Sequence, residues 1–410
     1  VLFGPTPSPF LLNAVLEAYL GTWQKRCSDV VAELRKSLYV DDFLSGGQET
    51  DQAQHAKQVT TEILQDGTFR LHKWNSNVQE LEDQETTQAT DEQTYAKQQL
   101  NVSKQESKLL GLKWIKREDT LSVVVPKEKV QSSKRGVLGK LARTYDPYGR
   151  IAPVTLEGKQ IYRDICESQR AWDAPLEESL QKRWQKWEEE TPNEYTVPRS
   201  ITSHQEEIKS VELHAFSDAS MTGVGATVYS VVHQPSGSCQ QLVAAKSRIA
   251  KKSLTIPRLE LVGAHMATNL LINVRNALDN IPTPQLFGWV DSTVVLHWIK
   301  GNGQYKQFVA NRVAKIQLHN EIQWRYVPTD DNPADLASRG GQIKKETLWK
   351  KGPEWLLNKD EWPKNPVTQS SPTSEAEAKA TKEILNVVQT NEDADEFDRL
   401  LERVDLRRAL

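Results

Sequence analysis

Cysteine, methionine and long apolar runs are scarce in this 410-residue sequence. The three cysteines, Cys27, Cys166 and Cys239, are widely separated and odd in number, so we expect a reducing compartment and no disulfide framework. The eight histidines and three cysteines show no paired spacing of the kind that zinc sites use. No apolar stretch approaches the ~18 residues of a membrane-spanning helix, so we expect no membrane partner.

An overall excess of positive charge is also missing, because 52 Lys and Arg face 55 Asp and Glu, for a net charge of −3. The distribution is uneven, however, and five basic residues gather before Glu260: Lys246, Arg248, Lys251, Lys252 and Arg258. Such a cluster could contact nucleic-acid phosphates. A solvated basic loop is an equally good interpretation.

Two polar stretches, 79–99 and 370–396, have the composition of exposed or disordered segments. The sequence begins with Val1 and carries neither an initiator methionine nor a charged leader. We read this start as an internal cut rather than a signal peptide.

Four acidic residues terminate or begin predicted elements: Asp218, Glu260, Asp291 and Asp335. Asp218 ends an alternating strand pattern that begins at Val211, and Asp291 follows the apolar run 286–290. Glu260 lies near the start of a predicted helix, with Gly263 and Ala264 on its face instead of Lys or Arg. Asp335 lies where a turn gives way to a helix.

Each acid taken alone has an ordinary structural explanation. Glu260 could be a first-turn acid favoured by the helix dipole, Asp291 an N-cap, and Asp335 an exposed loop residue. Asp218 has the weakest such explanation, because strands disfavour Asp. Acids left unpaired in buried positions are costly, and divalent cations with oxygen ligands would balance them. Two ions about 4 Å apart could activate water and stabilise the leaving oxygen of a phosphodiester.

These acids lie in motifs that resemble the RNase H domain of BEL/Pao-type LTR retrotransposon polyproteins. The motifs are AFSDAS at 215–220, PRLEL at 257–261, WVDS at 289–292, YVPT at 326–329 and NPADLASRG at 332–340. The resemblance implies an α/β fold: an α+β palm remnant followed by a mixed five-stranded sheet with flanking helices. Strand patterns agree with that order, three antiparallel strands preceding two parallel ones, at 211–218, 223–229, 242–247, 286–290 and 323–327.

The resemblance also implies a catalytic and metal-binding set of Asp218, Glu260, Asp291 and Asp335 that holds two Mg²⁺ ions, or Mn²⁺. Asp218 and Asp291 would bridge or flank the ions, Glu260 would bind one of them, and Asp335 would complete the second site. The implied reaction is hydrolysis of the RNA strand of an RNA–DNA hybrid, in the cytoplasm or within virus-like particles.

The histidine that retroviral relatives carry before the last acid has no counterpart, because the loop 328–331 reads PTDD. We therefore assign no histidine to catalysis and expect His214 and His297 to be packing or surface residues.

The first part of the chain resembles a reverse transcriptase. Residues 39–42 read YVDD, so Asp41 and Asp42 match polymerase acids, while Lys73 and Trp114 lie in motifs that imply contacts with nucleic acid. A polymerase needs a further acid from an upstream strand, which we do not find, so we expect no polymerisation by this chain alone. The implied partners are the remaining polyprotein parts, namely the fingers with the upstream palm, and the integrase.

The resemblance implies four regions: palm remnant 1–128, thumb and connection 129–205, RNase H-like domain 206–342, and a linker or tail 343–410 that leads toward an integrase region. Two other functions stay open. A hybrid-binding remnant without catalysis would bind through the thumb and connection. An aspartic peptidase would need an Asp-Thr-Gly or Asp-Ser-Gly loop, and neither tripeptide occurs.

Overall fold

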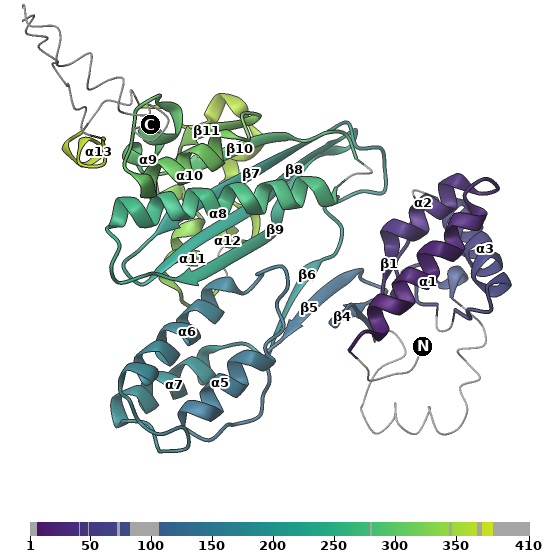
Figure 1. Cartoon of the computed structure of the whole chain (residues 1–410), viewed down its shortest axis with the longest axis horizontal. Coiled ribbons are helices and arrows are strands. Elements are labelled where there is room, and N and C mark those ends of the chain that lie inside the picture. The colour runs from purple at the N-terminus through teal and green to yellow at the C-terminus, as the bar shows by residue number, and fades with distance from the viewer. Residues whose placement is uncertain are drawn as a thin grey trace, which may run out of the picture.

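The computed structural model describes eight parts of the chain: residues 6–40, 42–47, 49–71, 74–82, 106–278, 281–343, 347–366 and 371–379. Within them lie a helical N-terminal unit, a four-stranded sheet with three helices, and a five-stranded sheet covered on both faces (Figure 1).

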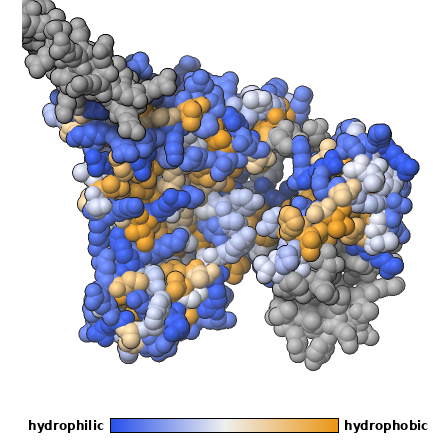
Figure 2. All heavy atoms as spheres, viewed as in Figure 1, coloured by the Kyte–Doolittle hydropathy of each residue, from blue (hydrophilic) through white to orange (hydrophobic). Residues whose placement is uncertain are grey.

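The N-terminal unit packs three helices against one another: α1 (Ser8–Trp23), α2 (Ser28–Ser37) and α3 (Thr50–Asp66). A short antiparallel pair, β1 (Leu38–Tyr39) and β2 (Asp42–Phe43), and a 3-10 turn η1 (Gln79–Leu81) complete it. Leu20, Val31, Leu34 and Ile63 form its core, which is separate from those of the other parts. Apolar side chains also reach the surface of this unit, on α1 among others (Figure 2).

The second sheet joins segments far apart in sequence. Its antiparallel order is β3 (Glu106–Leu109), β4 (Leu112–Ile115), β5 (Thr120–Val124) and β6 (Glu194–Pro198). Because β6 comes from the predicted connection, the boundary at residue 128 divides a sheet and does not separate packing units.

Three helices lie between β5 and β6: α5 (Lys134–Arg143), α6 (Ala152–Glu167) and α7 (Glu178–Glu190). Trp184 and Trp187 on α7 are buried and stacked, with ring centroids 4.7 Å apart. Their indoles belong to a core that continues into the five-stranded sheet.

The five-stranded sheet has the predicted mixed topology, in the order β11-β10-β7-β8-β9. Three strands are antiparallel: β7 (Ser210–Ala219), β8 (Gly223–Gln234) and β9 (Gly237–Ile249). β10 (Gln285–Val290) is parallel to β7, and β11 (Ile322–Tyr326) is parallel to β10. The α/β fold class expected from the sequence is confirmed.

One face of this sheet is covered by α8 (Ile256–Ala277), with α9 (Thr293–Lys300) and α10 (Gln307–Gln317) beside it (Figure 1). Alternate residues of β7, Val211, Leu213 and Ala215, point into this core. A 3-10 turn, η3 (Thr329–Asp331), follows β11.

The other face is covered by α6, by α11 (Ala334–Arg339) and by the segment 347–362. That segment contains α12 (Thr347–Lys351), η4 (Glu354–Leu357) and η5 (Lys359–Glu361). Trp349, Trp355 and Trp362 pack there against the sheet. The prediction that residues 343–410 form a linker or tail is therefore wrong for 347–362, because these tryptophans complete the core.

A final short helix, α13 (Pro372–Glu375), precedes a bridge between Ala378 and Tyr305. The part of the predicted polar tail from 380 onward, and most of the polar stretch 79–99, lie outside the described residues. All three cysteines are free, and no described helix is long and apolar enough to cross a membrane.

Candidate active site

Two of the four acids are placed by strand register. β7 and β10 run parallel, with Ser217 opposite Val290, so Asp218 and Asp291 come next at the same edge of the sheet. Asp218 is 8% exposed, and Asp291 is half-buried. Charged side chains at the ends of adjacent parallel strands are therefore neighbours in the fold, although 72 positions separate them in sequence.

Glu260 approaches the same edge from the helical face of the sheet. The first turns of α8 pass close to β7, since a Cβ added at Gly263 would lie 3.2 Å from the carbonyl oxygen of Asp218. The pKa of Glu260 is raised to about 7, mainly by burial and also by the charges of Asp291 and Asp218, while a hydrogen bond with Ser292 opposes the rise. Gly263, the small residue on the Glu260 face of the helix, thus permits the close approach of α8 to β7.

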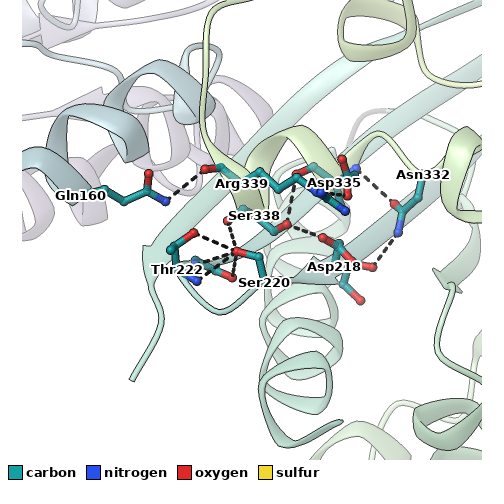
Figure 3. A network of polar contacts seen from close by, with 11 residues as sticks. Gln160, Asp218, Ser220, Thr222, Asn332, Asp335, Ser338 and Arg339 are labelled. Carbon is teal, nitrogen blue, oxygen red and sulfur yellow. Dashed lines mark hydrogen bonds and ion pairs between the residues drawn. The ribbon is translucent and has the colours of Figure 1, made fainter. Parts of the chain in front are cut away.

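Asp335 comes from the opposite face, on α11. This helix packs directly on β8, where a Cβ added at Gly225 would lie 2.6 Å from the Cβ of Ala337. The Ser338 hydroxyl of the same helix donates a hydrogen bond to Asp218 Oδ2 (Figure 3). The charge of Asp335 contributes to the raised pKa of Asp218, whose main cause is burial.

A set of polar contacts holds this edge together. Asn332 donates from Nδ2 to the Ser217 carbonyl (3.0 Å), and its Oδ1 accepts from the Ala334 amide (3.1 Å). Ser220 donates to the carbonyl of Ser338 (2.8 Å), which ties α11 to the end of β7 (Figure 3). Asn332, Ser220 and Ser338 lie in the sequence motifs given above, but their roles could not be predicted, because a hydroxyl or amide in a motif does not reveal its partner.

The carboxylates repel one another. Burial is the main cause that raises the pKa of Asp291 to about 6, and the charge of Asp218 adds to it. Among the described residues, no Lys or Arg forms an ion pair with Asp218, Glu260 or Asp291. Arg339 is the cation of this edge: its Nε donates to Asp335 Oδ1 (2.6 Å), and the charges of Asp218 and Asp291 also act on it.

The donor set suits hard divalent cations, which prefer carboxylate oxygens. Within the described parts of the chain, no group of three or more His, Cys, Asp or Glu side chains is arranged to hold a metal ion as it stands. In this structure Asp335 accepts a hydrogen bond from Arg339, and Asp218 accepts one from Ser338. The chemistry of the residues fits the ions, and the Arg339 contact occupies Oδ1 of Asp335.

Comparison with known proteins agrees with this architecture. Residues 133–292 match the family model described as the Pao retrotransposon-like RNaseH-like domain. The matched region begins at α5 and ends just after Asp291, so it includes the helices α5 to α7 as well as most of the sheet. No match was found among the curated proteins.

Among solved structures, the chain is similar to the N-terminal RNase H domain of rv2228c from Mycobacterium tuberculosis, with 17% identity, 32% of this chain and 91% of that chain covered, and a TM-score of 0.24. LC11-RNase H1 in complex with RNA/DNA hybrid shows 14% identity, 31% and 91% coverage, and a TM-score of 0.23. The foamy viral protease-reverse transcriptase in complex with RNA/DNA hybrid shows 13% identity, 59% and 31% coverage, and a TM-score of 0.35.

The basic residues predicted to contact nucleic acid differ in their surroundings. Lys246 and Arg248 are exposed two positions apart on β9, and Lys251 is exposed just beyond it. Lys252 forms an exposed ion pair with Glu167 (2.6 Å). Arg258 forms a two-bond ion pair with Glu377, at 2.7 and 3.0 Å, so its charge is balanced within the chain.

The polymerase-like residues are only partly described. Asp41 and Lys73 lie outside the described residues, whereas Asp42 is exposed in the β1–β2 hairpin. Trp114, which was predicted to contact nucleic acid, is buried in this structure. Its side chain is 7% exposed, and its Nε1 donates to Asp119 (3.0 Å), so no ring face is available to a base.

His214 is a packing residue, one of the two possibilities expected. It stacks on Phe287 with centroids 4.9 Å apart, and its Nδ1 accepts from Trp289 Nε1 (3.2 Å). Its Nε2 lies 3.2 Å from a carboxylate oxygen of Glu212, and burial lowers its pKa. His297 lies on α9, partly buried.

Proposed function

We propose that this chain is a ribonuclease of the RNase H type, which hydrolyses the RNA strand of RNA–DNA hybrids with the help of two divalent cations. The observation that supports it most is the meeting of Asp218 and Asp291 at one sheet edge, where Glu260 approaches from one face and Asp335 from the other. Burial is the main cause that raises the pKa of Asp218, Glu260 and Asp291, and the charges of neighbouring acids add to it; such shifted carboxylates are typical of functional sites.

In this proposal Asp218 and Asp291 would hold both ions, Glu260 would hold one of them, and Asp335 would complete the second site. Bound Mg²⁺ or Mn²⁺ would activate the attacking water and stabilise the leaving oxygen. Ser338 and Asn332 keep the end of β7 in place, since one bonds to the Asp218 carboxylate and the other to the Ser217 carbonyl. Arg339 holds Asp335 until an ion competes for it.

The exposed cations of β9 and the following loop, Lys246, Arg248, Lys251 and Lys252, would contact the phosphates of the hybrid. Recognition would follow groove shape and 2′-hydroxyl groups rather than base sequence, as is usual for RNA duplexes.

We also propose that the N-terminal unit with the four-stranded sheet is the C-terminal part of a reverse transcriptase palm, within a retrotransposon polyprotein. The support is that Tyr39 and Asp42 of the YVDD motif pair with each other in a short antiparallel hairpin.

The first test is cleavage of an RNA–DNA hybrid in Mg²⁺ by Asp218→Asn and Asp291→Asn. We expect each variant to lose at least about 100-fold in rate, because a neutral amide cannot balance the ions. Circular dichroism should show an unchanged fold. Asp330→Asn, an exposed neighbour outside the four acids, serves as the matched control and should cleave normally. Cleavage at the wild-type rate by either site variant would contradict the assignment.

A further inference from the structure

A segment far along the chain is built into the surface next to α8. Glu377 follows the short helix α13, whose start is fixed by a capping box between Ser371 and Ser374. The backbone beyond it bridges the loop before α10: the Lys306 amide donates to the Glu377 carbonyl, and the Lys379 amide donates to the Gln304 carbonyl, both at 2.8 Å. We call residues 371–379 the docked segment.

The docked segment delivers one carboxylate to a basic and aromatic surface. Both oxygens of Glu377 accept from Arg258, and the Glu377 side chain is only 13% exposed. The Arg258 guanidinium also lies over the Phe308 ring, 5.2 Å from its centroid, and Arg312 lies 3.7 Å from the same centroid. Lys306 Nζ donates to the Ala376 carbonyl (2.7 Å).

This surface lies beside the proposed site. Arg258 is in the first turn of α8, two residues before Glu260, and the exposed basic run that ends at Lys252 leads into it. The loop that carries Tyr305 and Lys306 follows α9, which begins directly after Asp291 and Ser292. A hybrid bound across the carboxylate edge and the basic run would thus meet Arg258 next.

Two oxygens of a carboxylate engage a guanidinium in the geometry that a phosphate uses. We propose that the docked segment is an internal competitor of nucleic acid: Glu377 occupies the phosphate position at Arg258, and the hybrid must displace it to bind fully. This inference rests on the proposed function, because the competing ligand is the hybrid's phosphate backbone.

The test compares Glu377→Gln and Glu377→Lys with the unchanged chain in binding to an RNA–DNA hybrid, with Ca²⁺ in place of Mg²⁺. We expect Glu377→Gln to bind roughly 3-fold more tightly and to gain about one unit in the slope of log affinity against log salt, because one more cation contacts phosphate. Glu377→Lys should gain more. Glu207→Gln is the matched control, since this exposed acid precedes β7 at the end of the strand away from Asp218. It should bind like the unchanged chain.

A double variant tests whether the gain in affinity comes from the loss of the Arg258–Glu377 ion pair. In the Arg258→Gln background, Glu377→Gln should change affinity no further. Hydrogen exchange gives a readout without cleavage: the Lys306 and Lys379 amides should be protected in the free chain and lose protection when hybrid is added.

Failure of the two proposals can be told apart. Normal hybrid binding, with no gain in Glu377→Gln and undisturbed protection of Lys379, would overturn the competitor role and leave the proposed function standing. Absence of hybrid binding in all variants, including Glu377→Lys, would overturn both.

Discussion

At the scale of single residues, the burial of acids in the candidate site lowers the stability of the fold at high pH. Burying Glu260 beside two other acids favours its protonated form, which is why its pKa is raised from 4.5 to about 7. A group whose pKa is higher in the folded chain stabilises the fold fully below its unfolded pKa, and this contribution is lost as the pH rises through the folded value. The metal-free site should therefore destabilise the fold at pH 8.

We expect Glu260→Gln to be more stable than the unchanged chain at pH 8 in EDTA, by on the order of 2 kcal/mol, because the amide carries no charge to bury. Near pH 4.5 the difference should vanish, since Glu260 is then protonated in the folded state. Urea unfolding at both pH values measures it. Glu207→Gln should show no such pH-dependent gain. A difference between the Glu260 variant and the unchanged chain that is the same at both pH values would contradict the electrostatic cause.

At the scale of elements, the family resemblance implied the arrangement of the five strands, and alternation and apolar runs located them in the sequence. Their ends were less predictable. The second strand was expected to stop at Tyr229, yet β8 continues to Gln234 across an irregularity in its register with β9 at Val228 and Tyr229. A local shift of this kind interrupts the alternating pattern without ending the hydrogen-bonded ladder, so sequence periodicity alone ends the strand too early.

The contact between β8 and α11 is an element-scale requirement for the site, because α11 carries both Asp335 and Ser338. Gly225 permits it, since an added Cβ would lie 2.6 Å from the Cβ of Ala337 and 2.7 Å from the Ser338 amide nitrogen. We expect Gly225→Ala to push α11 away, to cost about 1–3 kcal/mol, and to slow hybrid cleavage more than its stability loss explains.

The two effects are separated by measuring cleavage at a temperature where the variant is fully folded by circular dichroism. Gly139→Ala on α5 is the matched control, because nothing lies within 4 Å of its added Cβ. It should keep both stability and rate. A Gly225→Ala variant that is destabilised but cleaves at full rate would show that the position of α11 does not matter to the chemistry.

At the scale of the whole molecule, the regions expected from family likeness are not the units that pack. The boundary at 128 cuts the four-stranded sheet, the one at 205 crosses a continuous core, and the one at 342 removes a sheet cover. Motifs around Asp218 and Asp335 could be located from sequence because they are local. The sheet face that Trp349, Trp355 and Trp362 cover could not be predicted, because an isolated Trp in a polar segment does not indicate which residues it packs against.

Trp349 shows how the segment 347–362 contributes to the stability of the fold. It is 2% exposed, its Nε1 donates to the Arg150 carbonyl (3.0 Å), and its own carbonyl accepts from the Tyr229 hydroxyl (2.8 Å). One residue, through its side chain and its carbonyl, thus joins the segment before α6, the sheet and α12. We expect Trp349→Ala to lower the free energy of unfolding by about 3–5 kcal/mol, because a large cavity opens in a shared core.

Because that core runs without interruption from the four-stranded sheet to Trp362, its parts should unfold together, while the N-terminal unit, with its own core, should be unaffected. Hydrogen exchange distinguishes these regions: Trp349→Ala should lower protection in α6, α7 and β8 alike and leave α1 to α3 unchanged. Trp172→Ala, at a 47% exposed position, should change neither pattern. If protection fell in β8 and held in α6 and α7, the helices before the sheet would be a separate folding unit, and the boundary near residue 205 would be physical after all.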